Sequence, residues 1–256
     1  MNTVLWRPGV DELHNANISA FRDQINSTFQ LRLSTYPELY EWSVRNIPEF
    51  WEQVWHFTDI INSQSYNSIV DDPRRMPGAT WFKGARLNFA ENLLRSRDNR
   101  PAIHFQGEGQ TLRTLTHQEL FYEVEKLAHS LRDSGIQKGD RVAGFMPNMP
   151  ETVIAMLATA SIGAVWSSSS PDFGIKGVLD RFSQIEPRII FASNGYYYNG
   201  KEINVIERLP LILKKIKSIK KVIIINYPGK NYLNHKKKGG ITYFYWKELK
   251  KINILI

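Results

Sequence analysis

Residues 140–193 constrain the fold of this chain more than any other stretch. Three short, mostly apolar runs lie in it, at residues 142–146, 164–167 and 188–192. Consecutive runs start roughly two dozen residues apart, enough for a strand, a crossover helix and a return. Each run is nearly continuous rather than alternating, as in strands that are covered on both faces. The stretch therefore predicts an α/β fold with a doubly wound, largely parallel sheet and right-handed crossovers.

The two segments between these runs carry helix signals. Pro150 and Glu151 fit a first helical turn, where a missing N–H costs nothing and a carboxylate suits the helix dipole. The second segment has an apolar stripe at helical spacing, formed by Ile175, Val178, Leu179, Phe182 and Ile185. We expect Asp172 to be the N-cap of this second helix and Pro187 to end it.

Capping boxes predict three further helix starts, because in this motif a side chain at the N-cap and one three residues later satisfy free backbone amides. The pattern occurs at Thr35 with Glu38, at Asn46 with Glu49 and at Thr116 with Glu119. A β-hairpin is predicted just before the third of these helices. Its strands are the runs at residues 102–105 and 111–115, which flank a Gly-Glu-Gly turn.

The residues of this region resemble those of a known enzyme superfamily. The run PNMPETVIAMLATASIGAVWSSSSPDFG, residues 147–174, is similar to the large domain of the acyl-adenylate-forming, or AMP-binding, enzymes. The part WSSSSPDFG resembles the acetoacetyl-CoA synthetase branch more than the acetate branch. The resemblance covers nearly the whole chain, from residue 6 to residue 249, and it is specific in the middle and loose at the end.

The resemblance implies an ATP-dependent, AMP-forming ligase. In the first step ATP and acetoacetate give an acyl-adenylate and pyrophosphate, and in the second the thiol of CoA attacks the adenylate. The implied cofactors of the full-length family are ATP, Mg²⁺ and CoA, and CoA is the only one for which this chain offers candidate contacts. Another short-chain carboxylate, such as acetate or propionate, stays open as the substrate.

The resemblance also divides the chain in two. Residues 1–86 resemble the helical cap and linker that precede the adenylating fold in acetyl- and acetoacetyl-CoA synthetases. We expect their many aromatic side chains to pack onto the main domain rather than to form a ligand cage, because they recur at core spacing. Residues 87–256 resemble an incomplete AMP-binding domain.

The first candidate site is the serine-rich segment after the second predicted strand. It consists of Ser169, Ser170, Pro171, Asp172 and Phe173, between the C-terminal end of a parallel strand and the start of a helix. Open α/β sheets bind ligands at this place, and helix N-termini attract anions. A polar loop with an aspartate cap is the alternative interpretation. The resemblance implies that the segment lies along the pantetheine arm of CoA, near the acyl pocket.

The second candidate site lies at residues 195–202, which nearly match the P-loop pattern GxxxxGK[ST]. The match is weak, because position 202 is glutamate where a hydroxyl should hold Mg²⁺, and three tyrosines fill a loop that should wrap around phosphates. The resemblance implies a different role for Tyr198, Asn199, Gly200 and Lys201. They align with a basic turn that meets the nucleotide end of CoA, where Lys201 would contact a phosphate.

Composition excludes several classes of site. The chain has no cysteine, which excludes disulfides and Cys-based zinc sites, and its six histidines lack metal-ligand spacing. The net charge is +8, but residues 211–256 contain 12 lysines and one acidic residue. These lysines are dispersed and lack the interleaved aromatics of nucleic-acid-binding segments. No apolar run has transmembrane length. We expect a cytoplasmic protein without nucleic-acid or membrane partners.

Several motifs of the implied reaction do not occur in the 256 residues. These are the Ser/Thr/Gly-rich phosphate loop, the motifs for adenine, ribose and Mg²⁺, and the adenylation lysine. Adenylyl transfer depends on such positioned charges. The sequence therefore predicts the front part of a truncated or split synthetase that is inactive alone, with a separately encoded C-terminal part as one alternative. A non-catalytic module that binds CoA or a partner, and the product of a decaying gene, are the other interpretations.

Overall fold

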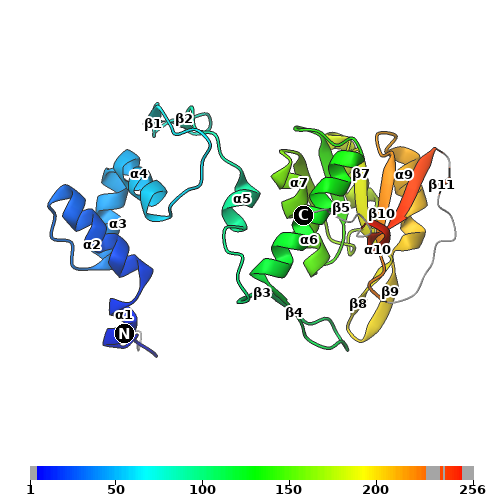
Figure 1. Cartoon of the computed structure of the whole chain (residues 1–256), viewed down its shortest axis with the longest axis horizontal. Helices are drawn as coiled ribbons and strands as arrows, with labels where there is room; N and C mark the ends of the chain where they lie inside the picture. Colours follow the sequence, from blue (N-terminus) through cyan, green and yellow to red (C-terminus); the bar gives the residue numbers. More distant parts are fainter. Residues whose placement is uncertain (1–4, 229–236, 239, 250–256) are drawn as a thin grey trace. The chain divides into compact units, whose positions relative to one another are not determined.

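The computed structural model of the chain describes residues 5–228, 237–238 and 240–249 (Figure 1). It divides into two compact units, Met1–Leu87 and Asn88–Ile256, and each unit is described by itself. The assignment of residues 1–86 and 87–256 to a helical cap and a partial AMP-binding domain stays a prediction.

The N-terminal unit is a helical body with one short antiparallel hairpin. Its elements are α1 Val10–His14, α2 Asn17–Phe29, α3 Tyr36–Arg45, α4 Ile47–Phe57, β1 Ser68–Val70 and β2 Trp81–Lys83. Phe21, Ile25 and Leu39 are its buried core. The rings of Phe50 and Phe57 meet the Phe21 ring edge to face, with centroids 5.8 and 5.0 Å away. Part of the aromatic content predicted to pack on the main domain therefore fills the core of this unit.

All three predicted helix starts are confirmed, and two of them carry the complete capping box. At Thr35 and at Thr116 the hydroxyl accepts a hydrogen bond from the amide three residues on, and the glutamate there accepts one from the threonine amide. Asn46 stands at the N-cap of α4 but makes no such side-chain bond. Asn46 Nδ2 donates to the Trp42 carbonyl at 2.8 Å instead, because Asn46 also ends α3.

The second unit is built on a sheet whose described strands lie in the order β11-β12-β10-β7-β5-β6. The strands are β5 Arg141–Phe145, β6 Val165–Ser169, β7 Ile189–Ser193, β10 Lys221–Ile225, β11 Lys237–Lys238 and β12 Ile241–Tyr245. All neighbours pair in parallel except β11, which pairs antiparallel with β12 at the edge. The three apolar runs of the sequence are β5, β6 and β7, so the predicted largely parallel sheet is confirmed.

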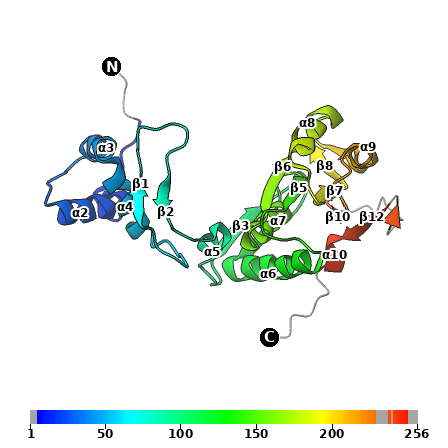
Figure 2. The same cartoon turned by 90° about the horizontal axis from the view of Figure 1, so that it is seen from above.

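Helices cover both faces of this sheet, which makes the fold doubly wound as predicted (Figure 2). The helices are α5 Phe89–Leu93, α6 His117–Asp133, α7 Pro150–Ser161, α8 Ile175–Ile185, α9 Leu209–Lys215 and α10 Trp246–Leu249. Alternate residues of β7 serve the two faces: Ile189 and Phe191 pack in the core of α6, α7 and α10, whereas Ile190 and Ala192 pack in the core of α8 and α9. This two-sided burial explains why the runs are continuously apolar.

Two hairpins project from this unit. The predicted hairpin is confirmed as β3 Pro101–Phe105 with β4 Arg113–Thr116. The second hairpin, β8 Gly195–Tyr198 with β9 Lys201–Asn204, was not predicted, and the short 3-10 helix η1 Ile206–Arg208 follows it. In Figure 1 the loop between β3 and β4 and the tip of the β8–β9 hairpin extend on the same side of the unit.

Cations at the amino ends of the strands stabilise the ends of the neighbouring helices. The contacts are Arg141 Nε to the Ile185 carbonyl at 2.7 Å, Arg188 Nη1 to the Gly135 carbonyl at 3.2 Å and Lys221 Nζ to the Ser134 carbonyl at 3.2 Å. The last carbonyl groups of a helix have no intrahelical partner and carry partial negative charge. The basic groups of this edge therefore serve the fold, and the carboxyl edge is the one left for a ligand.

Replacing Gly144 by alanine is expected to destabilise the protein. A Cβ on Gly144 would lie 2.5 and 2.6 Å from Cζ2 and Cη2 of the Trp166 indole, which crosses β5 at this point. Overpacking of this kind costs about 1–3 kcal/mol of unfolding free energy. Urea denaturation of Gly144→Ala measures the cost, and Trp166→Leu should remove most of it in the double variant. An equal cost in both backgrounds would contradict this explanation.

The N-terminal unit is expected to lose stability at low pH through Glu38. Hydrogen bonds from the backbone amides of Ser34 and Thr35 lower the pKa of the Glu38 carboxyl to about 2. In the unfolded chain the pKa of glutamate is about 4.3. The contribution of Glu38 to the unfolding free energy is therefore complete above that pH and is lost as the pH falls toward 2. In an NMR titration the Ser34 amide should shift with a midpoint near pH 2 and lose this step in Glu38→Gln. A midpoint near 4 would disprove the assignment.

Candidate functional site

The order of the strands reverses at β5, which makes this part of the sheet the expected place for a ligand. β6 follows β5 along the chain on one side, whereas β7 and the later strands lie on the other side. In open α/β sheets, ligands bind outside the carboxyl ends of the strands at such a switch point. β6 ends at Ser169 and β7 ends at Ser193. The carboxyl edge therefore carries a serine on each side of β5.

Both serine hydroxyls are buried and lack a hydrogen-bond partner among the described residues. A buried hydroxyl without a partner costs free energy, so such groups mark places where a ligand or water completes the structure. Ser169 is one of the predicted site residues. Ser193 was not, since nothing in its local sequence distinguishes it from any other strand residue.

The predicted site residues between β6 and α8 form a compact loop. Ser170 Oγ donates to Asp172 Oδ2 at 2.8 Å, and the Asp172 amide lies 3.4 Å from Ser170 Oγ. The prediction that Asp172 caps α8 is wrong, because Gly174 is the N-cap and makes no side-chain bond. The Asp172 carboxylate instead turns back onto its own loop and toward Tyr196.

The structure brings the two predicted segments together through Tyr196 and Arg208. The Tyr196 side chain lies near the Asp172 carboxylate. Burial raises the pKa of Tyr196, and the nearby Asp172 carboxylate raises it further. Arg208 Nη1 donates to the Pro171 carbonyl at 2.9 Å. The serine loop is thus held by the β8–β9 hairpin on one side and by the end of η1 on the other.

The predicted residues Tyr198, Asn199, Gly200 and Lys201 form the tip of the β8–β9 hairpin. Asn199 and Gly200 have φ values of 50° and 71°, as required at both central positions of a type I′ turn. The P-loop alternative is wrong, since a strand follows Gly200 where a P-loop needs a helix. The Asn-Gly dipeptide is the signal that could have identified this hairpin.

A carboxylate occupies the two amides of this turn. The Asn199 amide donates to Glu108 Oε1 at 3.1 Å, and the Gly200 amide donates to Glu108 Oε2 at 2.8 Å. Glu108 belongs to the loop between β3 and β4, some ninety residues earlier in the sequence. Lys201 is exposed directly beside these amides. The turn therefore presents donors in a geometry that suits an anion.

Phe173 is the last predicted residue of the serine loop, and its exposed ring lies beneath a cation. The guanidinium carbon of Arg181 is 4.2 Å from the ring centroid. Such a contact stabilises the ring and holds positive charge over the loop. The site thus has three cationic side chains near its two segments, those of Arg181, Lys201 and Arg208, against the carboxylates of Asp172 and Glu108.

A pocket of about 410 Å³ adjoins the β3–β4 loop at the carboxyl end of β10. Arg113 and Glu151 form an ion pair of 2.7 Å in its wall, and the Glu151 side chain is only 9% exposed. Phe105 and Tyr227 line it on the loop side. The ion pair fixes β4 to the first turn of α7 and so anchors the root of the loop that carries Glu108.

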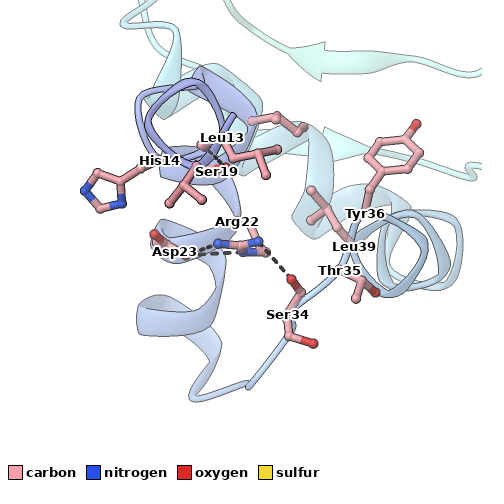
Figure 3. Close-up of a pocket in the computed structure, with 11 residues that line it drawn as sticks. Leu13, His14, Ser19, Arg22, Asp23, Ser34, Thr35, Tyr36 and Leu39 are labelled. Atoms are coloured by element: carbon pink, nitrogen blue, oxygen red, sulfur yellow. Dashed lines mark hydrogen bonds and ion pairs between the residues drawn. The ribbon is translucent and has the colours of Figure 1, made fainter. Parts of the chain in front are cut away.

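The N-terminal unit has a separate pocket of about 480 Å³ between α1, α2 and α3 (Figure 3). The Arg22 guanidinium in this pocket already has protein partners, because it donates to Asp23 Oδ1 at 3.1 Å and to the Ser34 carbonyl at 3.0 Å. Within the described residues, no His, Cys, Asp and Glu side chains form a group that could hold a metal ion. Among the helices that the structure describes in both units, none is long and apolar enough to cross a membrane.

Comparison with known proteins gives two family matches. A model described as AMP-binding enzyme matches residues 89–241, and one described as acetyl-coenzyme A synthetase N-terminus matches residues 36–93. Acetoacetyl-CoA synthetase of Macaca fascicularis is 44% identical over 227 residues, which cover 88% of this chain and 34% of the relative. Acetoacetyl-coenzyme A synthetase of Rhizobium meliloti is 41% identical over 93% of this chain and 36% of its own length.

The solved structure of acetoacetyl-CoA synthetase from Streptomyces lividans superposes with a TM-score of 0.88 at 35% identity. The match covers 98% of this chain and 38% of that structure. The chain thus spans about a third of the length of the curated relatives that it matches. The family match extends over more than half of the chain and includes the strands from β3 to β10, the serine loop and both hairpins. The chain belongs to the AMP-binding family of adenylate-forming enzymes.

Proposed function

We propose that this chain supplies the N-terminal part of an acetoacetate–CoA ligase. The proposed reaction converts ATP, acetoacetate and CoA into acetoacetyl-CoA, AMP and pyrophosphate. Its support is the similarity to acetoacetyl-CoA synthetases along most of the chain, together with the family match. In this proposal residues 1–86 are the helical cap, and residues 87–256 are the front of the adenylating domain.

The share of this chain in the reaction is to bind CoA. One observation carries this proposal: Arg208, which follows the β8–β9 hairpin, donates to the Pro171 carbonyl at 2.9 Å and so joins this part of the chain to the serine loop at the switch point of the sheet. The first segment, Ser169 to Phe173, would lie along the pantetheine arm. The second segment, Tyr198 to Lys201, would meet the nucleotide end.

The residues of this site fit the chemistry of CoA. Its phosphates are anionic, and Lys201, Arg208 and Arg181 supply positive charge along the two segments. Its pantetheine arm carries amides, which can bond the buried hydroxyls of Ser169 and Ser193. When bound, CoA supplies the thiol that accepts the acyl group. We propose that ATP and Mg²⁺ are held by parts of the full-length enzyme beyond the region described.

A ligase for another short acid is the nearest alternative. One relative, 36% identical over 87% of this chain, is named malonamoyl-CoA synthetase vrtB, from Penicillium aethiopicum. A non-catalytic module that binds CoA is the alternative from a different class. It predicts CoA binding by the chain without any contribution to turnover, whereas the ligase proposal requires both.

Lys201→Ala is expected to weaken CoA binding by about three- to tenfold, because one exposed cation is removed from a phosphate. Isothermal titration calorimetry with CoA measures the change. Lys214→Ala is the matched control, since Lys214 is an exposed lysine of α9 that belongs to neither segment. Unchanged CoA affinity in Lys201→Ala would contradict the placement of the nucleotide end at this turn.

Ligase function is tested in a chimera in which this chain replaces the matched region of the Rhizobium meliloti enzyme. We expect acetoacetate-dependent pyrophosphate release, with Lys201→Ala raising the KM for CoA and leaving the KM for acetoacetate unchanged. The 256-residue chain alone is expected to release none. A folded chimera that binds CoA but forms no thioester would favour the non-catalytic module. To test for a separately encoded partner, the remaining part of the Rhizobium meliloti enzyme is added to this chain as a second polypeptide and pyrophosphate release is measured.

A further inference from the structure

The loop between β3 and β4 reaches the tip of the β8–β9 hairpin with a single charged side chain. Both carboxylate oxygens of Glu108 are used, one on the Asn199 amide and one on the Gly200 amide. Hydrogen bonds from two successive amides to one carboxylate reproduce the way in which a turn of this kind binds a phosphate group. Glu108 therefore occupies the position in which an anionic ligand would meet these amides.

The loop is held in place beneath Glu108 by an aromatic contact. Tyr227 lies between Phe105 and Tyr197, with ring centroids 6.0 and 5.6 Å away. Gly107 lies so close to the Tyr227 hydroxyl that a Cβ would overlap it. Burial raises the pKa of Tyr227, and the nearby Tyr197 and Glu108 raise it further.

The root of the loop is fixed, whereas its tip is exposed. The ion pair between Arg113 and Glu151 joins β4 to α7. Glu108 and Gly109 are exposed, and Gly109 has a φ of 66°, a conformation that glycine adopts without strain. Glu108 therefore contacts the turn from the exposed tip of a loop whose base is fixed by the ion pair. Breaking it needs the rotation of one side chain or the movement of a few residues.

Glu108 opposes the binding of a phosphate at this turn in two ways. It takes the two amide donors, so that an incoming phosphate finds only the Lys201 ammonium. It also adds a negative charge within a few ångströms, where like charges repel. An exposed carboxylate that binds amides gives a modest stabilisation, which a more highly charged phosphate group can exceed.

We propose that Glu108 is an autoinhibitory latch, which must leave the Asn199 and Gly200 amides before a phosphate group of CoA binds them. This inference rests on the proposed function, because it takes CoA as the ligand of the turn. The latch keeps the nucleotide end of the site closed in the free protein. Binding of the phosphate releases the β3–β4 loop from the β8–β9 hairpin.

Calorimetry with Glu108→Ala and Glu108→Gln tests the latch. Both variants should bind CoA about three- to tenfold more tightly than the wild type, since the competing carboxylate is gone. Glu91→Ala is the matched control, because Glu91 is an exposed glutamate of α5 outside this contact. Dephospho-CoA, which lacks the 3′-phosphate, shows which phosphate is concerned: a gain confined to CoA assigns it to the 3′-phosphate. Equal or weaker CoA binding in both variants would overturn the latch.

NMR spectra of the Asn199 and Gly200 amides separate the latch from the proposed function. In the wild type both amide signals should shift when CoA binds, and they should lie at different positions in Glu108→Ala before CoA is added. If no variant binds CoA, the proposed function fails, and inorganic phosphate then tests the latch alone. Shifts of these two amides at lower phosphate concentration in Glu108→Ala than in the wild type would support it. The same response in both proteins, or none, would refute it.

Discussion

The two-sided burial of β5 and β7 is the constraint on which the rest of the second unit depends. Each of these strands sends alternate side chains into two separate cores, so both helical layers must form before either strand is covered. Because β6 and β7 flank β5, the same arrangement creates the switch point. The serine loop and the β8–β9 hairpin leave the sheet there. The strand order therefore sets the position of the site, and the loops supply its polar and charged side chains.

Local sequence patterns were enough to predict the sheet, because their physical causes act over short distances. A continuous apolar run means burial on both faces, and a capping threonine with a glutamate three residues later satisfies amides within one turn. Thr35 and Thr116 show this directly. Asn46 departs from the rule because it lies between two abutting helices and serves the end of the first one.

The contacts of the site could not be predicted in the same way, since they join residues far apart in the chain. The sequence neighbours of Asp172 predict a helix start there, but in the structure its carboxylate accepts from the Ser170 hydroxyl and lies near Tyr196, more than twenty residues away in the chain. The bond between Glu108 and the Asn199–Gly200 turn depends on two hairpins that extend to the same place. No local pattern encodes such a meeting. The Asn-Gly dipeptide could have indicated the turn, but only the fold shows which residue binds it.

The cations at the amino edge of the sheet have a consequence for practical work on this protein. Its many lysines invite substitution to reduce surface charge, for solubility or for crystallisation. Arg141, Arg188 and Lys221 should be excluded from any such scheme, since each one donates to a carbonyl group at or just beyond the end of a helix. Lys214 and Lys215 stand in the last turn of α9 and should be kept for the same reason. Lys83 is exposed and lies in the strand β2, away from any helix end, and is the better target.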